Sequence, residues 1–237
     1  MRENSINCDI KRILHDANAV CFDVDSTICQ DEAIDEFAKF LGYSENEIKK
    51  LTDMAMNGEM GTFQQSLTSR MYLLRPTKSQ FNAFLSNRKI LLSPKIEEFV
   101  FALQQRQIHV YLVTGSFRSF VLPVASILKI PKENIFANDI KFDCNGDYIG
   151  IDTNQLTSDS GSMNVGKAAV CGLLKQKMGY RNLVMIGDGI TDLEASPPAD
   201  VFIGFGGNKV REKVRKNAKW YVYDFNSLLE ALLSSNN

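Results

Sequence analysis

Short apolar runs that end in polar residues recur along the chain, at 19–22, 109–113, 183–186 and 201–203. Such runs are typical of central parallel strands, which are covered on both faces and therefore lack hydrophobic alternation. A further short run at 220–222 is predicted as an edge strand. The sequence thus predicts a mostly parallel sheet.

Between these runs, apolar residues recur at the three- and four-residue spacing of amphipathic helices. Ser93 and Pro94 are predicted as the N-cap and the first-turn proline of one such helix. Strands that alternate with helices indicate an α/β fold, doubly wound and Rossmann-like. The predicted helices cover residues 6–15, 32–41, 45–56, 63–74, 77–85, 96–103, 168–178 and 225–232.

Residues 30–92 show helical spacing without a strand-like run. Because connections in compact domains seldom run so long without structure of their own, we predict a helical cap domain inserted above the strand ends. The α/β core then consists of 1–29 and 93–237. Gly58 and Gly61 would make the cap adaptable enough to open and close.

A β-hairpin is predicted at 138–152, where two alternating runs flank Asn145 and Gly146. Asn-Gly is a strong signal for a hairpin turn. We interpret this hairpin as a structural element, with a flap near the functional site as one option.

The charge balance argues against nucleic acid as a partner. Lys and Arg total 27 against 28 Asp and Glu, which gives a net charge of -1, and no five-residue basic block occurs. No apolar run has membrane-spanning length, which argues against a membrane partner, and the first residues lack the apolar core of a signal peptide. We therefore expect a cytoplasmic protein.

Cysteine and histidine usage argues against two further classes of site. The five cysteines are scattered without a Cys-x-x-Cys pair, so neither a disulfide framework nor a zinc site is expected. The two histidines, His15 and His109, have no evident Ser or Cys partner, so a histidine-based triad is not expected.

Two carboxylates, Asp23 and Asp25, follow the first predicted strand. Ligands of open α/β sheets bind beyond the carboxyl ends of the strands, where Asp23 would project. Crowded carboxylates raise one another's pKa unless a cation or a proton is shared, and Mg²⁺ is the usual cation for oxygen ligands. The alternative is that the pair only forms a turn or a helix cap.

Other predicted strand ends carry suitable partners for an anion. The triplet from Thr114 to Ser116 offers a hydroxyl and backbone N–H groups, although an ordinary β-to-α turn is the alternative. Lys167 begins a helix, where the macrodipole disfavours a cation; it either points at bound phosphate or is simply solvated. Asp188 and Asp192 follow the 183–186 run within a glycine-rich turn and add two carboxylates.

In this order, strand-DxDST, strand-TGS, loop-GK and strand-GDGITD closely resemble the four motifs of the haloacid dehalogenase superfamily of aspartate-nucleophile phosphatases. Within it, similarity to the phosphoserine phosphatases extends over nearly the whole chain, from AVCFDVDST to NAKWYV. The resemblance implies Mg²⁺-dependent hydrolysis of O-phospho-L-serine through an aspartyl-phosphate, the last step of serine biosynthesis. The oligomeric state stays open, with a homodimer as one option.

The resemblance also implies roles for the four acids. Asp23 would be the nucleophile and Asp25 the general acid and base. Mg²⁺ would be held by Asp23, by the backbone carbonyl of Asp25 and by Asp188, with Asp192 supporting this shell.

The remaining motif residues are implied to bind the phosphoryl group. Thr114, the N–H groups of Gly115 and Ser116, and Lys167 would stabilise its equatorial oxygens. Thr191 is implied as a further substrate-binding residue.

Three residues are implied to recognise the rest of the substrate. Glu32 would pair with the ammonium group and Arg70 would bind the carboxylate bidentately, while Phe63 would pack over the substrate. The structural alternatives are a helix-start acid for Glu32 and a core position for Phe63.

The chain departs from the family pattern at two places. Ser116 stands where the family often has a second glycine, and the loop SGSMNVGK before the helix of Lys167 is longer than usual.

Two rival functions stay open. One is another small-molecule phosphatase or a phosphoserine-dependent phosphotransferase, and the other is a non-catalytic Mg²⁺-binding phospho-acceptor.

Overall fold

The computed structural model describes residues 2–48, 50 and 62–234, with side chains from Asp9 onward. Residues 45–48 and 50 are helical, as predicted. The rest of the helix predicted at 45–56 lies outside the described residues, as do Gly58 and Gly61.

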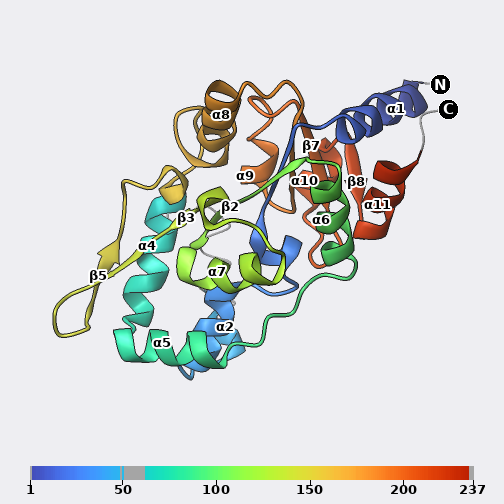
Figure 1. The fold of residues 1–237 in the computed structure, drawn as a ribbon. Coiled ribbons are helices and arrows are strands. Elements are labelled where there is room, and N and C mark those ends of the chain that lie inside the picture. Colours follow the sequence, from blue (N-terminus) through green and yellow to red (C-terminus); the bar gives the residue numbers. More distant parts are fainter. Residues whose placement is uncertain (1, 49, 51–61, 235–237) are drawn as a thin grey trace.

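A six-stranded sheet of order β3-β2-β1-β6-β7-β8 forms the centre of the molecule (Figure 1), and every neighbouring pair in it is parallel. The predicted parallel sheet is therefore confirmed, and the run at 220–222 lies at its edge. Sequence analysis missed β3, whose four residues include a polar one and follow a short 3-10 turn. The strands are β1 Ala19–Phe22, β2 His109–Phe117, β3 Ile135–Asn138, β6 Leu183–Gly187, β7 Val201–Phe205 and β8 Trp220–Val222.

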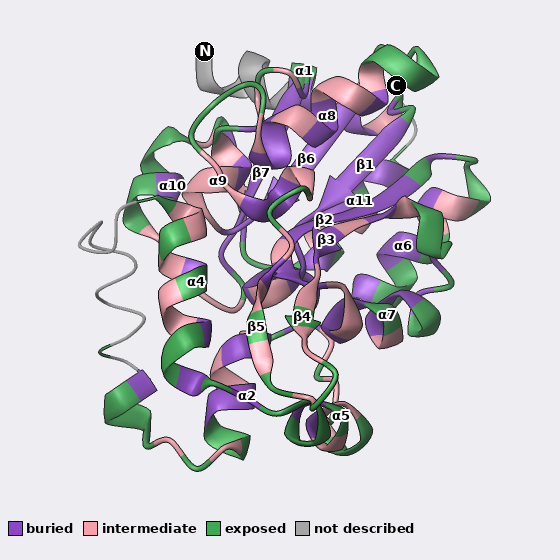
Figure 2. Cartoon of the chain, turned by 90° about the vertical axis from the view of Figure 1, so that its left-hand side faces the viewer, coloured by how far each residue is buried: buried purple, intermediate pink, exposed green. Residues whose placement is uncertain are grey.

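Both faces of the sheet are buried, as continuous apolar strands require. In β1, Val20 and Phe22 pack into one hydrophobic cluster and Ala19 and Cys21 into the other. Because successive side chains of a strand point to opposite faces, each strand contributes to both clusters. Figure 2 shows the strands buried along most of their length.

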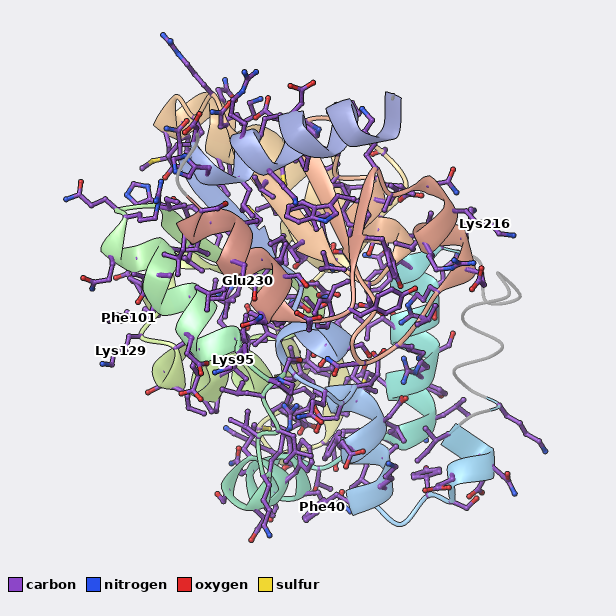
Figure 3. The ribbon with its side chains drawn as sticks, turned by 90° about the vertical axis from the view of Figure 1, so that its right-hand side faces the viewer. Phe40, Lys95, Phe101, Lys129, Lys216 and Glu230 are labelled. Carbon is purple, nitrogen blue, oxygen red and sulfur yellow. The ribbon has the colours of Figure 1, made fainter. Side chains whose placement is uncertain are left out.

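Helices cover the two faces, which makes the core doubly wound. The cluster with Phe22 also receives side chains from α1 Arg2–His15, α6 Ile96–Gln105, α7 Arg118–Ile127 and α11 Phe225–Leu233. The cluster with Cys21 receives them from α8 Gly166–Met178 and α10 Glu212–Asn217, while α9 Ile190–Leu193 packs at its border. On the outer surface, Lys95, Lys129 and the 58% exposed Phe101 point away from the core (Figure 3).

The predicted N-cap role of Ser93 is wrong. Helix α6 begins at Ile96, and Lys95 precedes it in a left-handed conformation with a φ of 69°. The buried hydroxyl of Ser93 instead donates to the carbonyl oxygen of Thr27 at 2.6 Å. The hydroxyl therefore binds a backbone oxygen that is distant in the sequence and does not cap the helix.

A third hydrophobic cluster joins the helices of residues 30–92 to the hairpin. Phe37, Phe81 and Phe84 pack with Phe117 and Phe120, and side chains of the hairpin border this cluster. The helices are α2 Ala33–Phe40, α4 Phe63–Leu74 and α5 Lys78–Asn87. The predicted hairpin is confirmed as β4 Ile140–Phe142 and antiparallel β5 Tyr148–Ile151.

Residues 30–92 leave the core and return to it at one place. Cys29 and Leu92 form an antiparallel bridge, and the N–H of Gln30 donates to the carbonyl oxygen of Leu91 at 2.8 Å. No helix in the described part of the chain is long and apolar enough to span a membrane.

Candidate active site

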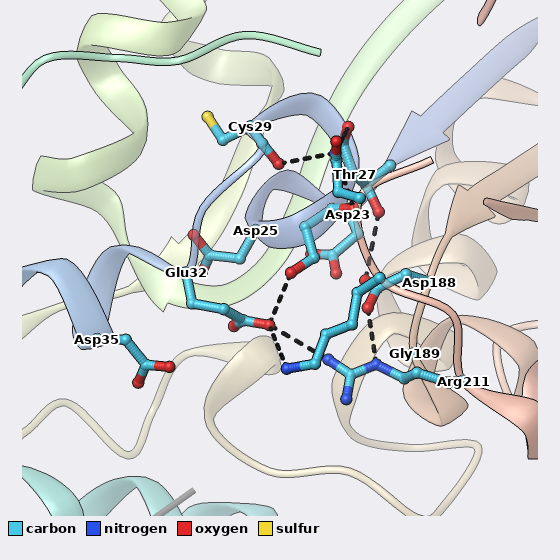
Figure 4. Close-up of polar contacts among 12 residues, drawn as sticks. Asp23, Asp25, Thr27, Cys29, Glu32, Asp35, Asp188, Gly189 and Arg211 are labelled. Carbon is cyan, nitrogen blue, oxygen red and sulfur yellow. Dashed lines mark hydrogen bonds and ion pairs between the residues drawn. The ribbon is translucent and has the colours of Figure 1, made fainter. Parts of the chain in front are cut away.

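A cavity of about 500 Å³ lies at the carboxyl ends of the strands. Its walls come from the turn after β1, the end of β2, the start of α8, the turn after β6 and helix α4. All twelve site residues predicted from the sequence lie in or around it, and Figure 4 shows part of the group.

The turn after β1 is η1 Val24–Ile28, a tight turn with a kink. Ser26 has a left-handed φ of 56°, which reverses the chain and directs Asp25 toward the cavity. The carboxylate of Asp23 accepts from the N–H of Val24 at 2.7 Å, and that of Asp25 accepts from the N–H of Ala33 at 3.0 Å. One N–H of this turn and the first N–H of α2 therefore fix the two carboxylates.

Asn208, which sequence analysis missed, holds this turn from outside. Its side-chain NH₂ donates to the carbonyl oxygens of Ser26 at 3.2 Å and of Thr27 and Cys29 at 3.3 Å. It also lies 2.7 Å from the hydroxyl of Ser93. The local sequence GGN gives no signal for this role, because the partners are far away in the chain.

Three buried carboxylates form a cluster, with oxygen atoms of Asp23, Asp188 and Asp192 all within 4.8 Å of one another. Burial and the negative charge of Asp23 raise the pKa of Asp188 to about 6. Burial raises the pKa of Asp192 to about 8, in spite of the adjacent Lys167. Carboxylates that resist ionisation together are suited to a divalent cation with oxygen ligands, so the group fits a metal site. The Asp25 side chain is not part of this cluster.

Asp192 occupies space that a glycine provides. A Cβ atom added to Gly187 would lie 2.2 Å from the carboxylate carbon of Asp192. The second oxygen of Asp192 accepts from the N–H of Gly189 at 2.9 Å. The glycines of the GDGITD motif thus admit the carboxylate at the strand end.

Lys167 lies inside the acidic group and is only 7% exposed, so the solvated alternative is wrong. Its Nζ lies 2.8 Å from Oδ1 of Asp23 and 2.6 Å from Oδ1 of Asp192. Burial alone would lower the pKa of Lys167, but the two carboxylates raise it above its ordinary value. The lysine is therefore charged and directed at the predicted nucleophile.

The triplet from Thr114 to Ser116 continues β2 and does not form the alternative β-to-α turn. The hydroxyl of Thr114 accepts from the N–H of Ser116 at 3.1 Å, so this N–H is already bonded. Asn138 donates to the carbonyl oxygen of Gly115 at 2.8 Å and so orients that peptide. Thr191 lines the cavity as well.

Glu32 also lines the cavity; it is the N-cap residue of α2, but its side chain makes no cap hydrogen bond. It accepts from the hydroxyl of Ser26 at 2.8 Å and pairs with Arg211 at 3.2 Å and with Lys209 at 3.6 Å. Burial alone would raise the pKa of Glu32, but Lys209 and Arg211 hold it below its usual range. An ionised carboxylate that already holds cations is suited to an ammonium group.

Arg70 and Phe63 also reach the cavity, from α4. Arg70 forms an ion pair with Asp35, in which both side chains are mostly buried. The ring of Phe63 lies directly over Gly115, where an added Cβ would be 2.2 Å from its Cζ atom. Phe63 is only partly buried: it lines the cavity and also packs against the third hydrophobic cluster.

Arg211 bridges Asp188 and Glu32, and sequence analysis missed it. Its Nε donates to Asp188 at 2.7 Å and its Nη2 to Glu32 at 3.2 Å (Figure 4). In the sequence it is one of several alternating cations after β7, which resemble a solvated surface. Only the fold reveals that it faces the acids.

Comparison with known proteins identifies the family. A sequence model of haloacid dehalogenase-like hydrolases matches residues 17–200. A curated phosphoserine phosphatase of Bos taurus is 48% identical over 94% of this chain and 97% of its own length. The chain belongs to the phosphoserine phosphatase family of haloacid dehalogenase-like hydrolases.

Solved structures of related proteins share the fold. A structure described as a phospho-aspartyl intermediate analogue of phosphoserine phosphatase has a TM-score of 0.72 at 25% identity and covers 90% of this chain and 98% of its own. DsGPDH of Dunaliella salina has a TM-score of 0.80 at 32% identity, and the match covers 94% of this chain and 37% of that one.

Membership of the phosphoserine phosphatase family makes the chain a phosphatase, as the sequence motifs predicted. It also agrees with the arrangement of side chains, since a buried carboxylate with a lysine at 2.8 Å faces a cavity large enough for a small phosphate ester. The buried cluster of three aspartates gives this family member a suitable place for a metal.

Proposed function

We propose that the chain hydrolyses O-phospho-L-serine to L-serine and phosphate, with Mg²⁺ bound and Asp23 as the nucleophile. The observation that carries this proposal is that one cavity is lined by Asp23 beside Lys167, which we call the reaction end, and by Glu32 and Arg70, which we call the recognition end. Such a cavity offers partners for the phosphate, the ammonium and the carboxylate of one small molecule. The names of the curated relatives support the same substrate.

Mg²⁺ would be held by the carboxylates of Asp23 and Asp188 and the backbone carbonyl oxygen of Asp25, with Asp192 supporting them. The donors are oxygen atoms, which Mg²⁺ prefers, and burial, together with the negative charge of neighbouring aspartates, raises the pKa values of Asp188 and Asp192. When bound, the ion supplies positive charge that lets an anionic carboxylate approach an anionic phosphate.

In the first step, a carboxylate oxygen of Asp23 attacks phosphorus and forms an aspartyl-phosphate, while the bond from phosphorus to the serine oxygen breaks. Asp25 gives its proton to that oxygen, and serine leaves. Burial, with the negative charges of Glu32 and Asp23, raises the pKa of Asp25 to about 8. Its carboxyl group is then largely protonated at neutral pH, the state that a general acid needs.

In the second step, Asp25 takes a proton from water as the water oxygen attacks phosphorus. The bond between phosphorus and Asp23 breaks, which releases phosphate and restores both carboxyl groups. Lys167, Thr114 and the N–H of Gly115 would stabilise the equatorial oxygens in both steps. The N–H of Ser116 can join them only by leaving the hydroxyl of Thr114.

At the recognition end, Glu32 would bind the substrate's ammonium group and Arg70 its carboxylate, and Phe63 and Thr191 would contact the bound molecule. To bind the substrate's carboxylate, Arg70 must first release its present partner, Asp35. A guanidinium can bind a carboxylate through two parallel hydrogen bonds, which a lysine cannot do.

We further assign 30–92 to a cap domain and 1–29 with 93–237 to the core. The bridge between Cys29 and Leu92 supports these boundaries, because the chain leaves and returns side by side there. The proposed setting is the cytoplasm, at the last step of serine biosynthesis.

The test is phosphate release from O-phospho-L-serine with Mg²⁺, beside phosphothreonine and a panel of sugar phosphates. A clear preference for phosphoserine is expected. Equal rates for all substrates would refute the substrate assignment, and no release from any of them would favour the non-catalytic alternative. Adding free serine or homoserine and measuring phosphate exchange tests the phosphotransferase alternative.

A further inference from the structure

The loop between β5 and α8 contacts the first turn of α4, far away in the sequence. Oδ1 of Asp159 accepts from the N–H of Gln64 at 3.1 Å and from the N–H of Ser160 at 2.9 Å. The first turn of a helix has N–H groups without partners inside the helix. At the start of α4, the hydroxyl of Thr62 accepts from the N–H of Gln65 at 3.3 Å, and the carboxylate of Asp159 accepts from the N–H of Gln64.

This contact fixes the part of α4 that covers the cavity. Phe63, whose ring lies on Gly115, is the first residue of α4 and directly precedes Gln64. A carboxylate at this end of a helix also interacts favourably with the helix dipole. Asp159 therefore holds the turn that presents Phe63.

The same loop packs against the start of α8. Gly166 has a φ of 76°, and an added Cβ would lie 2.8 Å from the carbonyl oxygen of Asp159. The next residue is Lys167, which contacts Asp23. Asp159 lies in the cavity wall between these elements, so it contacts both the helix of Phe63 and the helix of Lys167.

We propose that Asp159 is a positioning residue, which holds Phe63 over the reacting groups by binding the N-terminus of α4. Loss of one such carboxylate shifts the equilibrium of a helix end by about fivefold. The kinetic part of this inference rests on the proposed function. The loop SGSMNVGK, residues 160–167, which the resemblance implies to be longer than usual, directly follows Asp159.

Two variants of Asp159 and one control separate positioning from general stability. Asp159→Ala removes the acceptor and the charge, whereas Asp159→Asn keeps an acceptor oxygen without the charge. Asp224→Ala is the matched control, because Asp224 caps α11 by accepting from the N–H of Ser227 at 2.7 Å and lies outside the cavity wall.

The first measurement is hydrogen exchange of the peptide that contains Gln64, without substrate. Asp159→Ala is expected to speed exchange there about fivefold and Asp159→Asn to speed it less, since its oxygen can still accept. Asp224→Ala should change exchange only in α11. Unchanged exchange at Gln64 in Asp159→Ala would overturn the contact.

The second measurement is the kinetics with phosphoserine. Asp159→Ala is expected to raise KM about fivefold with kcat changed less than twofold, with Asp159→Asn between it and the wild type. Faster exchange at Gln64 with unchanged KM would reduce Asp159 to a structural cap and overturn its positioning role. If the wild type does not hydrolyse phosphoserine, the proposed function fails, whereas the exchange experiment still decides the contact.

Discussion

The two ends of the cavity hold their side chains in different ways. At the reaction end, Lys167 lies 2.8 Å from Asp23 and 2.6 Å from Asp192, and all three come from strand ends or the helix start beside them. At the recognition end, Glu32 and Arg70 come from the start of α2 and from α4, and both already bind charged groups of the protein.

This difference shows which part of the site is built before substrate arrives. Under the proposed function the reaction end takes a cation and a phosphoryl group, and oxygen atoms of Asp23, Asp188 and Asp192 already lie within 4.8 Å of one another. Under the proposed function, Arg70 must give up its ion pair with Asp35, whereas Glu32 would bind the ammonium group beside Arg211. Substrate affinity there is the difference between two sets of ion pairs, which makes it sensitive to single substitutions.

The largest expected effect is at the reaction end. Asp23→Asn should lower kcat for phosphoserine by about a thousandfold or more, because an amide cannot form the acyl phosphate on which the two-step reaction depends. Phosphate release measures the rate, and circular dichroism during thermal unfolding checks the fold. Turnover within tenfold of the wild type would show that another group attacks phosphorus.

Removing the metal should come next. A chelator is expected to abolish phosphate release and Mg²⁺ to restore it, because Asp23, Asp188 and Asp192 concentrate negative charge around the phosphate site. Mg²⁺ should also raise the thermal midpoint of the wild type, since a ligand of the folded state stabilises it.

Asp188→Asn should raise the Mg²⁺ concentration for half-maximal activity by about tenfold, because one charged ligand is lost. Asp147→Asn, at an exposed hairpin position, is the control and should leave this concentration unchanged. If both variants respond to Mg²⁺ as the wild type does, the three-aspartate cluster is not the metal site.

At the recognition end, Arg70→Lys should raise KM for phosphoserine about tenfold, because a lysine replaces two parallel hydrogen bonds by one point charge. Phosphoethanolamine keeps the ammonium but lacks the carboxylate, so its KM should hardly change. An equal effect on both substrates would mean that Arg70 does not bind the carboxylate.

Asp35→Asn sharpens this test, because Asp35 is the present partner of Arg70. If substrate must displace Asp35, the variant should lower KM about threefold by weakening the competing ion pair. A higher KM would show instead that Asp35 orients Arg70 for binding.

The sequence predicted where the reaction end lies, because apolar runs locate strands and parallel strands bring their carboxyl ends to one edge. That rule brings Asp23, Thr114 and Asp188 together, whereas their roles come from the family resemblance and stay predictions. Lys167 was ambiguous, since local pattern cannot distinguish a solvated lysine from one that two distant aspartates bury.

What the sequence missed depends on contacts between distant segments. Arg211 and Asn208 lie in a loop whose composition is ordinary. Arg211 binds Asp188, which follows β6, and Asn208 binds Ser26 in the turn after β1. Ser93 was assigned to its own helix because local signals favour a cap, whereas its hydroxyl binds Thr27. The local sequence pattern predicts where helices and strands lie. It does not predict which polar side chains bind each other when their segments are distant in the sequence.

The smallest expected effect concerns Ser116, where the resemblance implies a departure from the family pattern. The hydroxyl is buried and has no hydrogen-bond partner among the described residues, so Ser116→Gly and Ser116→Ala should each change kcat/KM by less than about threefold. Thr114→Val is the contrast, because it leaves the N–H of Ser116 without its acceptor and should cost about 1–3 kcal/mol of unfolding free energy in urea titrations. A loss of tenfold or more in Ser116→Ala, at unchanged stability, would show that this hydroxyl binds the substrate and that the departure from glycine tunes recognition.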